Sequence, residues 1–236
     1  GYVYSGPVAA YAYKILAERA DEYRNATIIL IGPNHRTAGF SGISVWTKGY
    51  WSTPLGKVAV DEELAKTILE GLKPFGEFHI GVHREEHALE IQLPFLQYAL
   101  GNDFKIVPIT FGAQSELASK KLAEVLEKLD DENIILIAST DLSHYYPESR
   151  AHSLDRIFIE SVLSGDAKEL TNLLGAGKCE ACGFGAVLTL LNACPKLGAD
   201  KIIELKYATS GDVPSGEKNR VVGYFAGAFV ASGKEV

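Results

Sequence analysis

The sequence has 236 residues, of which 47% are hydrophobic and 22% are charged, values that are ordinary for a globular protein. A formal net charge of −7 argues against a general nucleic-acid surface, and no apolar segment approaches the length of a membrane span. We therefore expect neither nucleic acid nor membrane as a partner. Three cysteines cannot all pair within one chain, so we expect a reducing, cytoplasmic location.

The length allows one large domain or two small ones. We find no linker-like boundary, no repeat and no low-complexity tract, and therefore predict a single domain over residues 1–236. The sequence contains no methionine, not even an initiator. We therefore expect that the natural chain has a segment before Gly1 or is processed.

Helices and strands alternate along the chain as expected for an α/β fold. In the first half we predict a helix over 8–20, strands over 26–31, 43–46 and 58–60, a helix over 61–72, a helix over 86–100 with Pro94 inside it, and a strand over 104–111. In the second half we predict a helix over 115–129, a strand over 133–138, helices over 148–163, 166–174 and 183–193, and strands over 202–207 and 221–230. The pattern predicts three layers, with helices on both sides of a central, mostly parallel or mixed sheet.

Two of the predicted strands run directly into polar residues. The first ends in Gly32-Pro33-Asn34-His35, and the strand over 133–138 is followed by Asp141 and His144. Ligand sites of α/β sheets lie at the carboxyl ends of the strands, so these residues predict one site. A histidine there binds metal or moves protons, and Asp141 is placed to orient it. The alternative is that Asp141 caps a turn and both histidines are solvated.

Residues 83–87 match H-x-x-E-H, the inverted signature of zinc peptidases. On a helix, His83 and His87 would share one face, and Glu86 would act as general base beside a metal-bound water. A third ligand would be needed. His87 and Glu90 are also spaced to face the site together, and the alternative is an exposed, charged helix start.

Cys179 and Cys182 form a CxxC pair, which is a candidate dithiol switch. Cys182 also stands at the start of the helix predicted over 183–193, where the helix dipole favours a thiolate that binds metal. Cys194 lies at the far end of that helix. The alternative is that all three cysteines are small, buried hydrophobic residues.

Ser210-Gly211-Asp212 follows the strand predicted over 202–207. This sequence indicates a turn first, and Ser210 and Asp212 are weaker candidates for the pocket.

Taken together and in this order, these segments resemble the Memo family, which is related in structure to the class III extradiol dioxygenases. The resemblance covers nearly the whole chain and rests on GYVYSG at 1–6, GPNH at 32–35, EHALE at 86–90 with LPF at 93–95, DLSHY at 141–145, ACG at 181–183, YATSGD at 207–212 and VGY at 222–224.

The resemblance implies a single α/β domain with a metal site at the strand ends. His35 and Cys182 would be metal ligands, and His144 would act as an acid or base. The second ligand histidine of the family lies in a Pro-His-Ala segment directly before Gly-Tyr, which places it ahead of Gly1. Fe(II) is the metal of the related dioxygenases. Because a thiolate replaces a carboxylate, Cu or Zn is also a candidate.

The leading functional hypothesis is a metal-binding, dioxygenase-like enzyme or redox protein that takes a small molecule in this pocket. A second hypothesis is a non-catalytic adaptor that binds a peptide or an anion in the same place, with Arg36 as the nearest basic residue. A zinc peptidase that uses His83, Glu86 and His87 is the third.

Overall fold

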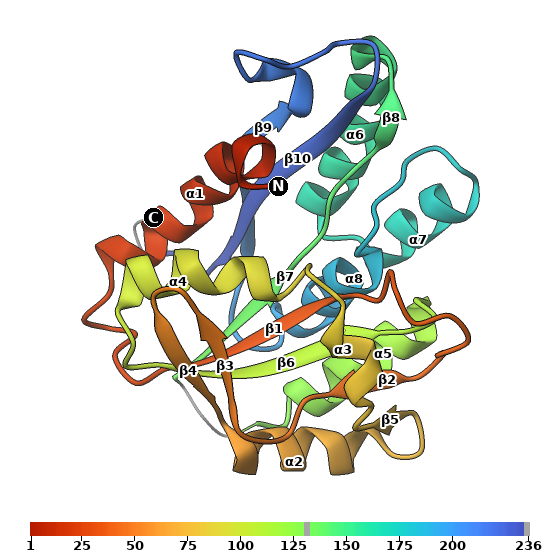
Figure 1. The fold of residues 1–236 in the computed structure, drawn as a ribbon. Helices are drawn as coiled ribbons and strands as arrows, with labels where there is room; N and C mark the ends of the chain where they lie inside the picture. The colour runs from red at the N-terminus through yellow and green to blue at the C-terminus, as the bar shows by residue number, and fades with distance from the viewer. Residues whose placement is uncertain (130–132, 234–236) are drawn as a thin grey trace.

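The computed structural model describes residues 1–129 and 133–233, and its centre is a seven-stranded sheet (Figure 1). Four strands run parallel: β4 (Gly56–Val60), β6 (Lys105–Phe111), β1 (Thr27–Pro33) and β7 (Ile134–Ala138). β3 (Tyr50–Thr53) pairs antiparallel with β4 and completes the order β3-β4-β6-β1-β7. The short strands β2 (Ile43–Val45) and β5 (Gly76–Glu77) extend from β6. The sheet is therefore mixed and mostly parallel, as predicted.

The C-terminal strands form a second, antiparallel sheet in the order β8-β10-β9. Its members are β8 (His144–Tyr146), β10 (Val221–Val230) and β9 (Lys201–Thr209). The prediction of one central sheet was thus incomplete, because β9 and β10 pair with each other and not with a strand of the central sheet.

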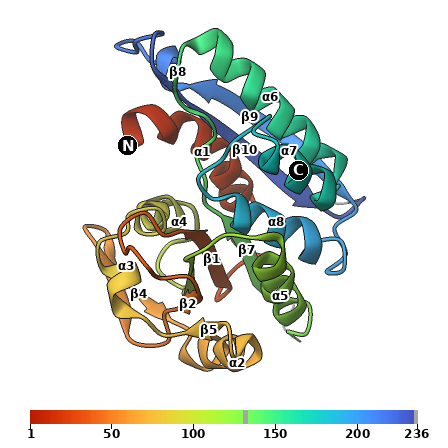
Figure 2. The same ribbon diagram turned by 90° about the vertical axis from the view of Figure 1, so that its right-hand side faces the viewer.

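Helices cover both faces of the central sheet (Figure 2). On one side, α1 (Tyr2–Glu18) packs against α4 (Leu93–Leu100), and on the other α2 (Glu62–Leu72), α5 (Glu116–Leu126) and α8 (Phe184–Ala193) lie together. α6 (Glu148–Ser164) packs against the second sheet on the face opposite α1, and α7 (Ala167–Gly175) bridges α6 and α8. The predicted α/β fold is confirmed.

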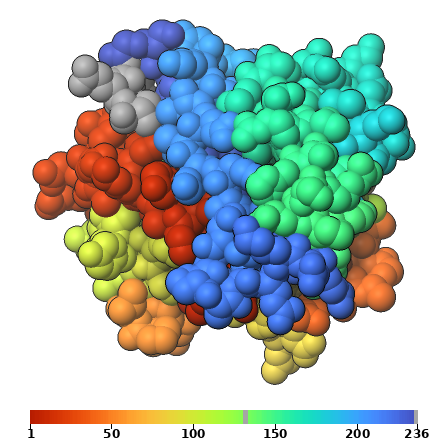
Figure 3. Space-filling model, turned by 90° about the horizontal axis from the view of Figure 1, so that it is seen from above, coloured from red at the N-terminus to blue at the C-terminus, as the bar shows by residue number. Residues whose placement is uncertain are grey.

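The first helix is longer than predicted. α1 begins at Tyr2 and not at residue 8, and its first residues are mostly exposed, so they show no apolar periodicity. Figure 3 shows this N-terminal helix lying beside the C-terminal strands on the molecular surface. Among the described residues, no helix is both long and apolar enough to cross a membrane.

The helix predicted over 86–100 is not continuous. α3 (Ile80–Arg84) ends before it, a 3-10 helix covers Glu90–Gln92, and α4 begins at Leu93. Pro94 lies in the first turn of α4, where a missing N–H costs nothing. The predicted helix is therefore broken just before Pro94, and the segment ahead of α4 turns toward the end of β1.

The main hydrophobic core lies around β1, all seven residues of which are buried. The strand is buried on both faces because helices cover both sides of the sheet. This packing fixes where β1 ends, and so fixes where the residues that follow it project.

Candidate functional site

The polar segments that follow β1 and β7 lie at the same edge of the central sheet. The two strands pair directly, with Ile31 opposite Ala138, and the Ser139 amide donates to the Ile31 carbonyl at 2.8 Å. The prediction that these two strand ends meet is confirmed. We call this edge the rim.

His35 is held at the rim by a buried carboxylate. The Glu86 side chain is 6% exposed, and it accepts a hydrogen bond from the His35 backbone N–H at 2.6 Å. The His35 Nδ1 atom lies 3.1 Å from both Glu86 oxygens. The same carboxylate accepts from the backbone N–H groups of His87 at 2.9 Å and Ala88 at 3.0 Å. Nδ1–H therefore donates to Glu86, and Nε2 is the ring nitrogen left for another partner.

These contacts shift the pKa of both partners. Hydrogen bonds to the Cys182 thiol and to Glu86 outweigh partial burial and raise the pKa of His35 to about 10. Burial alone would raise the pKa of Glu86, but hydrogen bonds from His35 and Ala88 lower it to about 2. The His35 ring thus lies between a carboxylate and a thiol.

Cys182 comes from the segment just before α8, which docks onto the end of β7. The Cys182 Sγ atom accepts a hydrogen bond from the Asp141 N–H at 3.1 Å, and the Gly183 N–H donates to Thr140 Oγ1 at 2.7 Å. Gln114 donates from Nε2 to the Cys182 carbonyl at 2.6 Å. A Cβ atom on Gly183 would collide with the Ser139 carbonyl, so only glycine permits this close approach.

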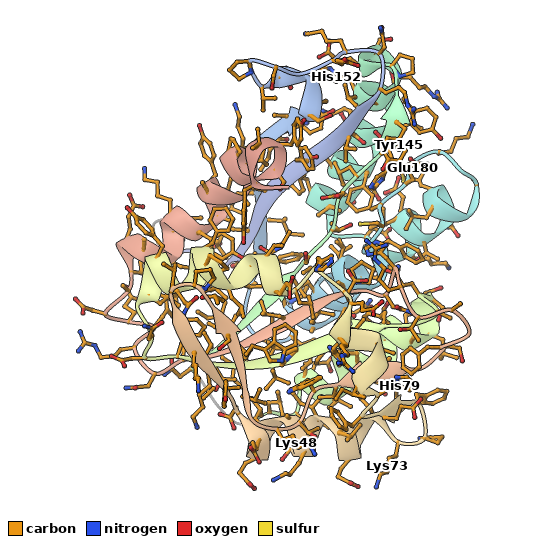
Figure 4. All side chains as sticks on the ribbon, viewed as in Figure 1. Lys48, Lys73, His79, Tyr145, His152 and Glu180 are labelled. Carbon is orange, nitrogen blue, oxygen red and sulfur yellow. The ribbon has the colours of Figure 1, made fainter. Side chains whose placement is uncertain are left out.

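His144 and Asp141 flank the thiol. The His144 Nε2 atom lies 3.7 Å from Asp141 Oδ2, and this carboxylate raises the pKa of His144 against the effect of burial. His144 is the first residue of β8, and its backbone N–H donates to Glu180 at 2.9 Å. Glu180 lies beside β8 in Figure 4. Among the described residues, Asp141, His144 and Cys182 form the one group of three or more His, Cys, Asp or Glu residues whose ligand atoms all lie within 4.8 Å of one another.

The weaker candidates for the pocket serve the local structure. Asn34 bonds within its own loop, accepting from the Thr37 N–H at 2.8 Å. Ser210 accepts from the Val222 N–H at 3.0 Å, and Asp212 caps a short 3-10 helix. The structure therefore assigns these side chains to turns. It does not bring them to the contacts among His35, Glu86, Asp141, His144 and Cys182, which we call the rim cluster.

The His87 Nδ1 atom lies 2.7 Å from Glu90 Oε1, within hydrogen-bond distance, and the two side chains are 62% and 55% exposed. They match the alternative of an exposed, charged segment.

The helix expected to present a zinc-peptidase site does not form. α3 ends at Arg84, so the prediction that His83 and His87 share a helical face is wrong. His83 is buried, with its ring nitrogens 2.9 Å from Ser44 Oγ and 3.3 Å from Thr110 Oγ1. Burial lowers the pKa of His83 to about 4. It is a neutral core histidine.

Glu86 is the site residue whose role the sequence did not reveal. It appeared there as a peptidase base, whereas the structure makes it the partner of a histidine that lies 51 positions away. No local spacing signals such a pair. The clue to this contact is that Glu86 lies in a break between helices. Because residues 85–89 belong to no helix, they can fold back toward β1.

A cavity of about 690 Å³ opens at the rim and continues into the molecule between β7 and β10. His35, Glu86, Asp141 and Cys182 are among its lining residues. The rim cluster therefore has access to an interior space.

The family model for Memo-like proteins matches residues 1–228. A Sulfurisphaera tokodaii protein described as a MEMO1 family protein is 41% identical over 233 residues, which are 97% of this chain and 80% of the relative. A Methanosarcina mazei protein with the same description is 42% identical over 229 residues, 96% and 81% of the two chains. The crystal structure of an uncharacterized Escherichia coli K12 protein matches with a TM-score of 0.56 at 15% identity, over 90% of this chain and 91% of the other, and supports the fold alone. The chain belongs to the Memo-like protein family.

Proposed function

We propose that the rim site binds a metal ion through His35 and Cys182 and carries out dioxygenase-like or redox chemistry on a small molecule. The observation that carries the proposal is the contact of His35 with Glu86. A buried carboxylate that fixes one ring nitrogen and leaves the other facing a thiol is the arrangement that metal-binding histidines use.

The donors at the rim fit such an ion. The Asp141 N–H donates to Cys182 Sγ at 3.1 Å and so orients the sulfur atom. Asp141 and His144 have polar atoms within 4.8 Å of the same thiol, so they lie beside the proposed ion and can act on a molecule bound next to it. Thiolate and imidazole donors favour iron, copper or zinc over magnesium or calcium.

A redox-active ion bound there would supply electron transfer or oxygen chemistry. The chain itself would provide proton transfer. Asp141 raises the pKa of His144, so this imidazole keeps its proton to a higher pH than an isolated histidine does. His144 would therefore act as a general acid toward a ligand at the rim, and Asp141 would orient its ring.

Metal content tests the proposal. The protein is purified anaerobically from its complete gene, and bound iron, copper and zinc are measured in the wild type and in His35→Ala and Cys182→Ser. The matched controls are His87→Ala, an exposed histidine, and Cys179→Ser, a buried cysteine outside the cluster. We expect near-stoichiometric metal in the wild type and the controls, and at least about tenfold weaker binding in the two site variants. Equal metal content in all five proteins would refute the metal site.

The adaptor hypothesis has one supporting observation, which is that Arg36 is exposed beside His35. Calorimetric titration of the metal-free and metal-loaded protein with a phosphotyrosine peptide separates the two functions. Binding that is independent of metal, and lost in Arg36→Ala, would favour the adaptor.

A further inference from the structure

Asp155, on α6, is a carboxylate that the protein encloses completely and that lies outside the rim cluster. Its side chain is 0% exposed. Oδ1 accepts a hydrogen bond from the Ser143 backbone N–H at 2.9 Å, and Oδ2 accepts one from the Tyr207 hydroxyl at 2.8 Å. Among the described residues, no cationic side chain lies within ion-pair distance of Asp155, and the adjacent Arg156 pairs with Glu204 instead. Because a buried carboxylate without a cation is costly, the contacts of Asp155 call for an explanation other than stability.

The chain directly ahead of the His144 ring is held at three successive points. The Ser143 N–H donates to Asp155, the Ser143 carbonyl accepts from the Gly223 N–H at 3.0 Å, and the His144 N–H donates to Glu180 at 2.9 Å. A Cβ atom on Gly223 would collide with Asp155 Oδ2, so only glycine allows the carboxylate and β10 to approach this closely. The backbone that carries His144 is therefore fixed from α6, from β10 and from the segment before α8.

Directly after His144 the backbone is strained. In the pairing of β8 with β10, His144 lies opposite Val222 and Tyr146 opposite Val221, so Tyr145 is the extra residue of a β-bulge. Its φ is +65°, in the left-handed region that bulky residues rarely adopt. Such a conformation persists only where the surrounding contacts impose it, and it is often found at functional sites.

The contacts that impose the bulge come from the two carboxylates on either side of it. Glu180 accepts from the His144 N–H and from the Tyr146 hydroxyl, at 2.9 and 3.3 Å, and so spans the bulge, whereas Asp155 fixes the chain ahead of it (Figure 4). The Tyr145 side chain is 62% exposed, and its ring lies against the His144 ring with the centroids 5.7 Å apart. The strain therefore gains little burial, and its main effect is on the direction of His144.

We propose that Asp155 is a positioning residue for His144 and acts on it through the backbone of Ser143. It holds the chain against the strain at Tyr145 and so keeps the His144 Nε2 atom 3.7 Å from Asp141 Oδ2. The inference rests on the proposed function only in taking His144 as the proton donor of the rim site. The positioning itself requires neither a bound metal nor turnover.

The same carboxylate gives the second sheet a part in the site. Tyr207 lies on β9 and donates to Asp155, and Gly223 lies on β10 and leaves room for it. Both residues belong to segments that carry the family resemblance, yet neither is among the residues of the rim cluster. Their contacts with Asp155 give them a role in supporting the segment that carries His144.

NMR of the metal-free protein tests the positioning. Asp155→Asn keeps the size of the side chain but turns an NH₂ group toward one of two hydrogen-bond donors. We expect the Ser143 amide to exchange at least about tenfold faster than in the wild type, and the nuclear Overhauser contact between the His144 and Tyr145 rings to be lost. Asp166→Ala is the matched control, since it removes a carboxylate that caps α7 and also lowers stability, but it should leave both readings unchanged.

Tyr207→Phe is a milder variant, because it leaves Asp155 in place and removes only the hydroxyl that orients its carboxylate. It should raise Ser143 exchange by a smaller factor and weaken the contact between the His144 and Tyr145 rings. A wild-type ring contact in either folded variant would overturn the proposal, and so would an equal loss of the contact in Asp166→Ala.

Metal content separates this inference from the proposed metal site. Asp155→Asn should bind as much metal as the wild type, in contrast to His35→Ala and Cys182→Ser. A parallel loss of metal in Asp155→Asn would show that Asp155 supports the whole rim and would overturn a specific role toward His144. A wild type that binds no metal would refute the metal site, and the NMR measurements, which are made without metal, would still decide the positioning.

Discussion

Replacing Glu86 with glutamine removes the charge that holds His35 at the rim. The carboxylate accepts hydrogen bonds from three backbone N–H groups and from the His35 ring, at distances of 2.6 to 3.1 Å. A glutamine keeps the shape of the side chain but has one oxygen, so at least one buried N–H group loses its acceptor. We therefore expect the Glu86→Gln protein to fold with lower stability and with a less firmly oriented His35.

The pKa of Glu86 sets the magnitude of the loss. A fall from the usual 4.5 to about 2 corresponds to roughly 3 kcal/mol of preference for the ionised form in the folded state. Because the folded-state pKa is lowered, this stabilisation is present above pH 4.5 and is lost as the pH falls through 2. At pH 6, Glu86→Gln should therefore lower the free energy of unfolding by about 3 kcal/mol.

The pH dependence above neutrality gives a second readout. The folded-state pKa of His35 is raised to about 10, so its contribution is complete below pH 6.5 and is lost as the pH rises toward 10. In the metal-free protein, the free energy of unfolding should therefore decline over this range. The decline should be shallower in Glu86→Gln and should persist in part, because the contact of His35 with Cys182 remains.

Urea denaturation of metal-free protein between pH 5 and 9 measures both effects. Glu90→Gln is the matched control, since Glu90 pairs with His87 at the surface and such pairs contribute at most about 1 kcal/mol. If Glu86→Gln and Glu90→Gln lose the same stability at pH 6, or if Glu86→Gln keeps the wild-type pH profile, the structural role assigned to Glu86 is refuted.

Three further predictions concern other parts of the fold. Because burial lowers the pKa of His83 to about 4, the contribution of this residue to stability should fall by about 2 kcal/mol between pH 7.5 and 5. In denaturant unfolding over this range, the wild type should therefore change by about 2 kcal/mol toward lower stability relative to His83→Gln. Gly183→Ala should cost about 1–3 kcal/mol by thermal denaturation because its Cβ meets the Ser139 carbonyl, whereas Gly175→Ala, with open space around it, should be nearly neutral. Asp141→Asn should lower the pKa of His144, and NMR titration of its ring in metal-free protein should show this; an unchanged pKa would contradict their pairing.

The sequence predicted the elements that carry a strong local pattern. The apolar run of β1 and the similar run of β7 were both found, and their pairing brings Asn34-His35 and the segment from Ser139 to the same rim. Helices with an acidic or polar N-cap, such as α2 after Asp61, were also found. In these elements local preference and burial agree, so the pattern is sufficient.

The misses occur where a long-range contact decides the structure. Residues 85–89 have helical spacing but leave the helix, because Glu86 accepts hydrogen bonds from the backbone and ring of His35 at the end of β1 and from the backbone N–H groups of His87 and Ala88. The separate sheet of β9 and β10 was missed for a similar reason. Strand composition shows that a segment is a strand, but it does not show which neighbour the strand pairs with.

The motif at 83–87 shows how one carboxylate determines the chemistry of two histidines. Glu86 turns toward His35, and this leaves His83 to the hydroxyl groups of Ser44 and Thr110 in the core. Burial keeps His83 neutral, whereas the carboxylate and the Cys182 thiol favour the protonated form of His35. Because a metal ligand must give up its proton, ion binding at His35 should release protons and strengthen as the pH rises. The same five residues therefore supply a core histidine, His83, and the carboxylate that holds His35 at the rim.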